Sequence, residues 1–241
     1  MYLCALKQFM TMEENSSHIL VVDDEEDICE ILKFNLESEG YFVDTVNSAE
    51  DALRKKLERY NLFLLDVMMK GMSGYKLADE IRKRKKITAP IIFITAKNSE
   101  NDKLTGFSLG ADDFITKPFS VKEIVARVKA VIRRVEASSL TEASGTVIRI
   151  SGIELDPDKK RLNIDGRRED LTPIEFQLLH ILIRNPGRIF NRDQILDAVW
   201  RDINVTERTV DVHVTRLRKK LGDYGRFLVT RKGYGYCFEM D

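Results

Sequence analysis

The sequence predicts an α/β protein: a doubly wound, five-stranded parallel sheet followed by a smaller α+β domain. In the first half, apolar runs of strand length alternate with helical patterns. The run at residues 62–65 is apolar on both faces, as is typical of a strand covered by helices on both sides. At 241 residues, the chain is long enough for roughly two domains, each with its own core.

The elements expected in the first half follow one another as five β/α repeats. The expected strands lie at residues 19–22, 42–46, 61–66, 91–94 and 114–116. The expected helices lie at residues 28–36, 48–57, 73–86, 98–109 and 120–134. Gly40 stops the first helix, and Ser48, Ser73 and Ser120 are N-caps. Because parallel neighbours need right-handed helical crossovers, this order implies a doubly wound sheet.

Polar side chains end three of the expected strands. Asp23 and Asp24 follow the first strand, Asp66 ends the third, and Thr95 follows the fourth. A single Asp at such a place is more often a turn residue or a helix cap. Parallel sheets place ligands at the carboxyl ends of their strands, so together these side chains predict one crevice. Clustered carboxylates repel unless a hard cation neutralises them, which indicates Mg²⁺ and phosphoryl transfer to a carboxylate.

The composition is typical of a soluble globular protein, with 43% hydrophobic and 32% charged residues. No apolar run approaches the roughly 18 residues of a membrane span. Residues 1–17 lack the apolar segment and cleavage site of a signal peptide, so we expect a disordered N-terminal extension. Met10 and Met12 are alternative start sites.

The cysteines indicate the compartment of the protein, and the charge distribution indicates the kind of partner it binds. Cys4, Cys29 and Cys237 are widely spaced and have no pairwise metal spacing, which favours reduced thiols in a cytoplasm. The formal net charge is zero, but residues 146–241 carry 18 basic and 15 acidic side chains. This asymmetry favours an anionic partner for the second half.

A linker and a second domain are expected after the first half. Residues 136–145 contain Ala, Ser, Thr and Gly with little apolar periodicity, which predicts a flexible linker. The domain at 146–241 begins with short runs that predict an antiparallel sheet with tight turns, at 147–150, 154–155 and 161–164. Thr172, Pro173 and Glu175 predict a helix start with a capping box.

The remaining pattern is helix, turn, helix and hairpin. Asn191 caps a helix that runs from Arg192 to Trp200, and a third helix runs from about Glu207 to Leu221. A hairpin at 227–236 follows. In the third helix the expected buried stripe is Val210, Val214, Leu217 and Leu221, and the side chains expected elsewhere on it are Arg208, His213, Arg216, Lys219 and Lys220. A helix of this size fits the major groove of DNA.

The acidic residues, Thr95 and Lys117-Pro118 together resemble the receiver domain of bacterial two-component response regulators, over residues 18–135. The resemblance implies that Asp66 accepts a phosphoryl group from a phosphohistidine on a sensor kinase. It implies that Asp24, Asp66 and the backbone carbonyl of Met68 bind Mg²⁺, and that Asp23 acts largely through water. The apolar Met68 offers no group to orient water, so we hypothesise a long phosphorylated lifetime.

The same resemblance implies which residues respond when Asp66 is phosphorylated. Lys117 pairs first with the carboxylate and then with the phosphoryl oxygens, and the Lys117-Pro118 bond is expected to be cis. Thr95 donates its hydroxyl to the phosphoryl group, and Phe114 turns inward when Thr95 moves. The segment 98–134 also resembles a dimerising face. Its expected contacts are Lys103 with Glu123, Asp113 with Arg127, Asp112 with Arg134, and the apolar Leu104.

Residues 147–238 resemble the winged-helix effector domain of the OmpR/PhoB subfamily, on the motifs at 208–214 and 233–236. The implied DNA-binding residues are Arg208, Val212, His213, Arg216, Arg218, Lys219, Thr230 and Lys232. Of these, Val212 and Arg216 face base edges and Lys232 lies at the minor groove. His213, Arg218 and Thr230 contact backbone phosphate. The loop 201–206 matches a segment that contacts RNA polymerase.

These features predict a cytoplasmic, phosphorylation-dependent transcription regulator that is not an enzyme. Phosphorylation biases a pre-existing equilibrium of the receiver towards a homodimer, and dimerisation links two DNA modules so that avidity raises promoter occupancy. Two alternatives stay open. One is a phosphorelay intermediate, which leaves the basic helix without a purpose. The other is a constitutive DNA-binding protein whose receiver only dimerises.

Overall fold

The computed structural model describes residues 17–96, 99–140, 146–200 and 205–240. Residues 1–16 of the expected N-terminal extension lie outside this part of the chain. So do residues 97–98, residues 141–145 of the expected linker, and residues 201–204 of the loop expected to contact RNA polymerase. In the part that the structure describes, no helix combines the length and the apolar character needed to cross a membrane.

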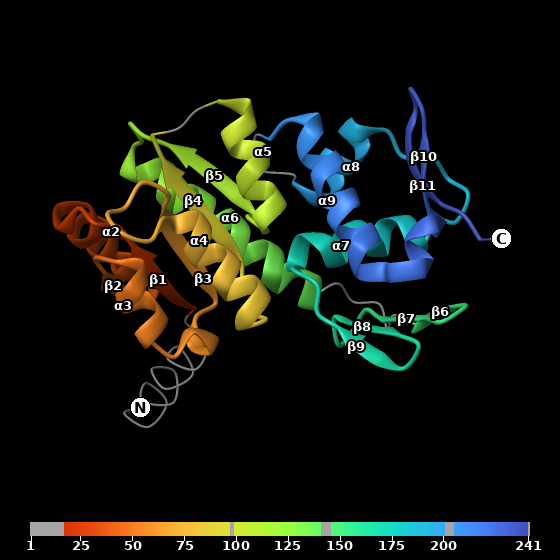
Figure 1. Ribbon diagram of the computed structural model, residues 1–241, viewed down its shortest axis with the longest axis horizontal. Helices are drawn as coiled ribbons and strands as arrows, with labels where there is room; N and C mark the ends of the chain where they lie inside the picture. The colour runs from red at the N-terminus through yellow and green to blue at the C-terminus, as the bar shows by residue number, and fades with distance from the viewer. Residues whose placement is uncertain (1–16, 97–98, 141–145, 201–204, 241) are drawn as a thin grey trace, which may run out of the picture.

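The N-terminal part contains the expected parallel sheet, in the order β2-β1-β3-β4-β5 (Figure 1). Its strands are β1 His18–Val22, β2 Phe42–Val46, β3 Leu62–Asp66, β4 Ile91–Thr95 and β5 Asp113–Thr116. The strand order reverses between β1 and β3, where Val22 pairs with Leu65. This switch point places Asp23 and Asp66 side by side at the carboxyl edge, where a doubly wound sheet binds ligands.

Alternate residues of the strands pack against helices on opposite faces of this sheet. Ile19 and Leu64 belong to the cluster that includes α2 and α6, whereas Leu20 and Leu65 belong to the cluster that includes α3, α4 and α5. The helical segments are α2 Glu26–Ser38, α3 Ala49–Arg54, the turn η1 Leu57–Arg59, α4 Gly74–Asp79, the π-helical turn η2 Glu80–Arg84, α5 Glu100–Leu109 and α6 Val121–Leu140. Both faces of the sheet are covered, as the sequence predicts.

Two helix ends differ from the prediction. The helix capped by Ser48 ends at Arg54, and a separate short turn at Leu57–Arg59 follows. Helix α6 continues to Leu140 instead of stopping near Arg134, so the first part of the expected linker is helical. Ala and Glu in this segment have good helix propensity, and adding a residue to an existing helix needs no new nucleation.

The C-terminal part has the expected sheet, helices and hairpin. A four-stranded antiparallel sheet comprises β6 Ile148–Ile150, β7 Ile153–Asp156, β8 Arg161–Ile164 and β9 Arg167–Glu169. The later elements are α7 Pro173–Ile183, α8 Arg192–Val199, α9 Glu207–Leu221, the 3-10 turn η3 Gly222–Phe227, and the hairpin of β10 Leu228–Arg231 and β11 Gly235–Phe238. This arrangement of three helices and a hairpin is a winged helix.

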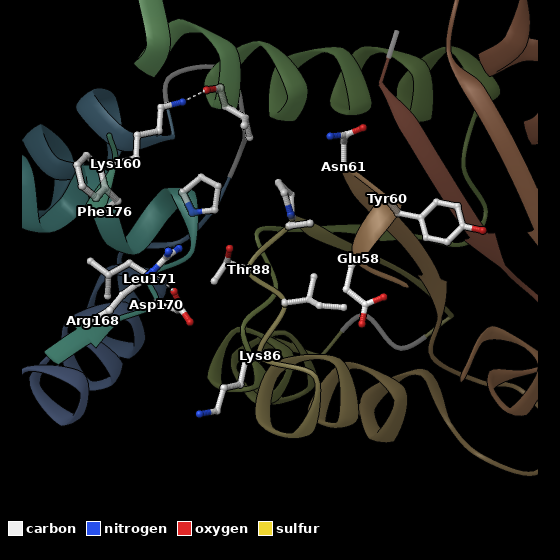
Figure 2. Close-up of a pocket in the computed structure, with 15 residues that line it drawn as sticks. Glu58, Tyr60, Asn61, Lys86, Thr88, Lys160, Arg168, Asp170, Leu171 and Phe176 are labelled. Carbon is white, nitrogen blue, oxygen red and sulfur yellow. Dashed lines mark hydrogen bonds and ion pairs between the residues drawn. The ribbon is translucent and has the colours of Figure 1, made fainter. Parts of the chain in front are cut away.

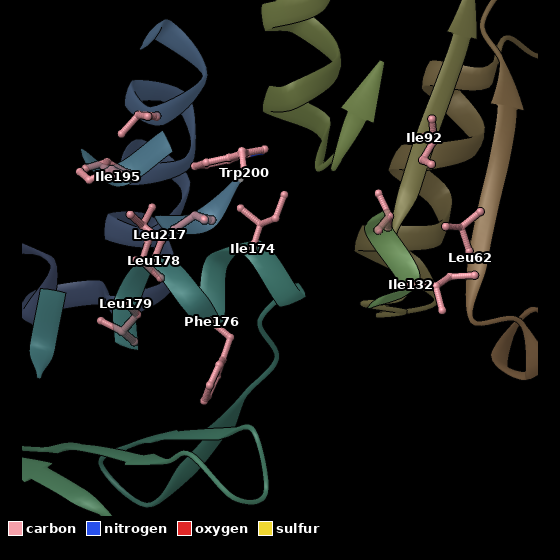
Figure 3. Packing of buried hydrophobic residues seen from close by; sticks show 14 of the residues in the cluster. Leu62, Ile92, Ile132, Ile174, Phe176, Leu178, Leu179, Ile195, Trp200 and Leu217 are labelled. Carbon is pink, nitrogen blue, oxygen red and sulfur yellow. The ribbon is translucent and has the colours of Figure 1, made fainter. Parts of the chain in front are cut away.

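The caps predicted from sequence form. Thr172 and Glu175 make a reciprocal capping box on α7, and Asn191 and Gln194 make one on α8. Around these helices lies a core that includes Ile174, Leu178, Ile195, Trp200 and Leu217, drawn in Figure 3. The buried stripe predicted for α9 lines this core.

Candidate functional site

Three carboxylates meet at the carboxyl edge of the sheet. One oxygen each of Asp23, Asp24 and Asp66 lies within 4.8 Å of the others. Asp66 is the last residue of β3 and only 3% exposed, and its Oδ1 accepts a hydrogen bond of 3.1 Å from the backbone N–H of Met68. Asp24 accepts one of 3.2 Å from the backbone N–H of Lys70. The loop after β3 therefore orients two of the three acids.

A glycine keeps this loop close to the strand. A Cβ placed on Gly74 would lie 2.1 Å from the carbonyl oxygen of Asp66, so a side chain has no room there. The loop that follows Asp66 therefore packs closely against the end of β3. Met68 points outward and is 55% exposed.

Lys117 is the cation of this pocket. Its Nζ lies 3.2 Å from Asp23 Oδ2, 3.3 Å from Asp66 Oδ2 and 3.0 Å from Glu25 Oε1. The Lys117-Pro118 peptide bond is cis, as predicted. Burial by itself lowers the pKa of Lys117, but the hydrogen bond to Glu25 and the charges of Asp23 and Asp66 outweigh it and raise the pKa. Lys117 is therefore protonated at neutral pH.

The pocket retains an excess of negative charge that suits a metal ion. Burial raises the pKa of Asp23, and the neighbouring Asp66 carboxylate adds to that effect, while Lys117 and the backbone N–H of Glu25 oppose it. Several acidic oxygens close to one ammonium group form a donor set that fits Mg²⁺, a hard cation with oxygen ligands.

The two predicted switch residues lie behind the pocket. Thr95 is the last residue of β4 and is fully buried. Phe114 is 7% exposed, and its ring centroid lies 5.2 Å from Phe93 and 4.9 Å from Phe107. A Cβ on Gly106 would lie 2.0 Å from the Phe114 ring, so Gly106 on α5 makes room for an inward aromatic side chain.

Several charged residues of the expected dimer face form ion pairs or hydrogen bonds within the chain. Arg127 on α6 lies 3.0 Å from both Asp113 Oδ2 and Glu123 Oε1. Asp112 accepts hydrogen bonds from the backbone N–H of Ile91, at 2.9 Å, and from Arg82, at 3.3 Å. Burial raises the pKa of Asp113 to about 6, although Arg127 opposes the shift. Arg82 is a partner of this face that sequence reasoning missed; it lies in a basic run typical of a solvated helix end.

The residues expected to contact DNA divide into two groups. Arg208, Lys219 and Lys232 are exposed. Arg218 donates to the carbonyl of Leu228 at 2.9 Å and to the hydroxyl of Thr230 at 2.7 Å, so it connects α9 to the wing.

The other group, Val212, His213 and Arg216, lies against the N-terminal part. The prediction that His213 lies outside the buried stripe is wrong: its side chain is 1% exposed. Its ring centroid lies 5.9 Å from Phe107 on α5 and 5.2 Å from Trp200. The physical reason is that α9 packs on α5, as Figure 1 shows, a long-range contact that helical periodicity does not encode.

Glu175 is the second site residue that sequence reasoning missed, because its capping role explained its presence. The carboxylate is fully buried and accepts from Arg216 Nε at 2.9 Å and from Lys220 Nζ at 2.7 Å. Burial raises its pKa, but Arg216 and Lys220 overcome that effect and lower the pKa to about 2. Glu25, which binds Lys117 at 3.0 Å, was also missed, because the two residues are 92 positions apart and no local pattern connects them.

Farther from α9, the two parts leave a cavity of about 490 Å³ between them (Figure 2). Lys160 from the C-terminal part donates to the carbonyl of Val135 on α6 beside it, at 2.5 Å. Burial lowers the pKa of Lys160. Charges of both signs line this space, including Glu58, Lys86 and Arg168.

Comparison with known proteins matches both parts. Residues 19–129 match the family "Response regulator receiver domain", and residues 166–238 match "Transcriptional regulatory protein, C terminal". The phosphate regulon transcriptional regulatory protein PhoB of Rhizobium meliloti is 43% identical over 226 residues, which cover 92% of this chain and 98% of that protein. The transcriptional regulatory protein ResD of Bacillus subtilis is 40% identical over 237 residues, or 95% and 98% of the two chains.

Among solved structures, a mutant form of RitR aligns with a TM-score of 0.77 and 26% identity, covering 94% of this chain and all of that chain. These similarities and the acid pocket confirm the predicted fold and function class. The chain belongs to the OmpR/PhoB family of response regulators, and it is a phosphorylation-dependent, DNA-binding transcription regulator rather than an enzyme.

Proposed function

We propose that Asp66 is the phosphoryl acceptor and that the donor is a phosphohistidine of a sensor kinase. The observation that supports this most strongly is the geometry of the Asp66 carboxylate, with Oδ1 held by the Met68 N–H and Oδ2 beside Lys117. In the transfer, the P–N bond of the donor breaks and an O–P bond to Asp66 forms. Lys117 then binds the transferred phosphoryl oxygens, as a point charge on a flexible stem can.

Mg²⁺ bound by Asp24, Asp66 and the Met68 carbonyl, with Asp23 acting through water, would neutralise charge on the transferring phosphoryl group. The chain's own part is to keep the three acids together. Burial of Asp66 and of Asp23 limits the access of water to the acyl phosphate.

The phosphorylated receiver, residues 18–135, dimerises in this proposal through Lys103, Leu104, Asp112, Asp113, Glu123, Arg127 and Arg134. The signal passes through Thr95 and Phe114, whose ring packs on Phe107 of α5. The winged helix, residues 146–241, then binds promoter DNA through α9 and the wing. The loop 201–206 contacts RNA polymerase, and the protein acts in the cytoplasm.

The experiment is to measure molar mass in solution with Mg²⁺, with and without beryllofluoride, for the wild type and Asp66→Ala. We expect a monomer that becomes a dimer only with beryllofluoride and only when Asp66 is present. A second measurement replaces Mg²⁺ by chelator, and we expect the dimer to be lost.

Other outcomes identify the alternatives. A mass that does not respond to beryllofluoride contradicts the switch and favours constitutive binding. Return of the phosphoryl group from Asp66 to a histidine protein, without any phosphorylation-dependent change in DNA binding, favours a phosphorelay intermediate.

A further inference from the structure

The recognition helix α9 binds the C-terminal end of α5. The guanidinium of Arg216 donates to the carbonyls of Phe107, at 3.2 Å, and Ser108, at 2.9 Å. The last carbonyls of a helix lack the usual N–H partner one turn later and carry the negative end of its dipole, so a cation there is favourable. The Phe107 carbonyl also accepts from the Gly110 N–H at 3.0 Å. Arg216 thus caps a helix of the receiver while its Nε binds Glu175.

Apolar contacts surround this cap. Val212 packs against the receiver cluster that contains Phe107 and Phe114. The imidazole of His213 lies between the rings of Phe107 and Trp200. Val212 and Arg216 are the side chains proposed to reach bases, so DNA cannot contact them while α5 covers them. Helix α5 is also part of the proposed dimer face.

His213 makes this contact sensitive to protonation. Neither of its ring nitrogens has a hydrogen-bond partner among the described residues. The charged groups that act on it are Arg216 on its own helix, Glu175 on α7, Arg134 on α6 and Arg82 on η2. A proton on the imidazole would therefore be buried beside three arginines and one carboxylate.

We propose that protonation of His213 opens the α5–α9 contact; the chain with this contact is called the closed form, and the chain without it the open form. The regulatory role of this opening rests on the proposed function, because the closed form hides side chains that are proposed to bind DNA. It adds acidification as a second input beside phosphorylation.

The direction of the effect follows from linkage. Burial, with Arg216 as the largest neighbouring charge, lowers the pKa of His213 in the closed form to about 3. In an open form that exposes the imidazole to water, His213 would titrate near its ordinary value of about 6.5. The closed form is therefore favoured above that pH and is lost as the pH falls below it. At about pH 5.5 the ratio of open to closed molecules should be roughly tenfold higher than at about pH 7.5.

The test uses the full unphosphorylated chain without DNA, so that it does not depend on phosphoryl transfer or on operator identity. Amide hydrogen exchange of α5 and α9, corrected for the intrinsic pH dependence, is measured at about pH 7.5 and 5.5. We expect the protection that arises from the contact to fall roughly tenfold in the wild type. It should not change with pH in His213→Phe, which keeps an aromatic ring but cannot be protonated.

Asp113, whose pKa is about 6, titrates in the same range, and the His213 variant separates its effect from that of His213. If the Phe ring does not fit, His213→Leu serves the same purpose. Equal pH dependence in the wild type and in the folded His213 variant would overturn the proposal, as would unchanged protection in the wild type.

A matched pair of glycine variants tests the closed form independently of pH. Gly110 and Gly40 have positive φ of 100° and 89°. A Cβ on Gly110 would lie 2.8 Å from the guanidinium of Arg216 and 2.9 Å from Arg82 Nε, whereas one on Gly40 would have nothing within 4 Å. We expect Gly110→Asn to increase the radius of gyration at about pH 7.5 and Gly40→Asn to leave it unchanged.

Discussion

Glu175 shows how one residue can serve two levels of structure. Its backbone position and carboxylate complete the capping box of α7, and the same carboxylate neutralises Arg216 and Lys220. Removing one member of a buried ion network leaves the others with uncompensated charge, which costs more than the network contributes.

We therefore expect Glu175→Gln, which retains an oxygen for the cap, to lower the free energy of unfolding of the C-terminal part by about 3 kcal/mol. Urea unfolding followed by the fluorescence of Trp200, the single tryptophan, measures this. An unchanged urea midpoint would show that the charges of Arg216 and Lys220 do not need the Glu175 carboxylate for stability.

The lowered pKa of Glu175 also makes the stability of the folded chain depend on pH. Its pKa of about 2 in the folded chain lies below the ordinary value of 4.5. Its contribution to stability is therefore fully present above pH 4.5 and is lost as the pH falls towards 2. Glu175→Gln should lack this part of the acid dependence, and the difference between the two midpoints should shrink on acidification.

Substitution of Met68 tests how fast the phosphoryl group on Asp66 is lost to water. Its side chain is exposed beside Asp66 and has no polar group to orient an attacking water. We expect the phosphorylated wild type to keep its label for minutes or longer, and Met68→Asn to lose it faster. Label decay after removal of the donor measures both rates. Loss within seconds from the wild type would contradict the hypothesis.

At the scale of elements, the helix caps account for helix starts in the C-terminal part. The Thr172 hydroxyl accepts from the Glu175 N–H at 3.4 Å, and the Glu175 carboxylate accepts from the Thr172 N–H at 2.9 Å. Asn191 and Gln194 repeat this arrangement on α8.

We expect Thr172→Ala to destabilise the C-terminal part by about 1 kcal/mol, with Asn191→Ala as the matched change at α8. Because Thr172 is buried and Asn191 is exposed, the Thr172 variant should lose more. Equal urea midpoints for Thr172→Ala and the wild type would show that packing alone positions α7.

At the scale of the whole molecule, the closed form and the proposed dimer compete for α5. Lys103 and Glu123 lie on α5 and α6, the two helices of that face. We expect Lys103→Glu and Glu123→Lys each to abolish the beryllofluoride-dependent dimer, and the double variant to restore it, as a pair across a twofold axis requires.

Molar mass in solution measures the outcome. Glu123 also binds Arg127 within the chain, so Arg127 should retain Asp113 as its partner in the variants. Two single variants that dimerise like the wild type would place the dimer face elsewhere.

The five-stranded sheet, the helix starts and the acid pocket could be predicted from the sequence. These follow from local patterns: apolar runs that end in Asp23 and Asp66, and capping residues such as Thr172. Repeating β/α units allow few topologies, so strand order brings the acids together without further information.

The covered face of α9 and the partners of several charged residues could not be predicted in this way, because they depend on long-range contacts. His213 and Arg216 lie on a polar face by helical periodicity, yet α5 of the receiver buries or binds them. Arg82 binds Asp112 and Glu175 binds Arg216, pairs 30 and 41 residues apart in sequence. The reason is physical: contacts between elements far apart in the sequence, within each part and between the two parts, depend on matching surfaces, which a periodic pattern within one helix does not specify.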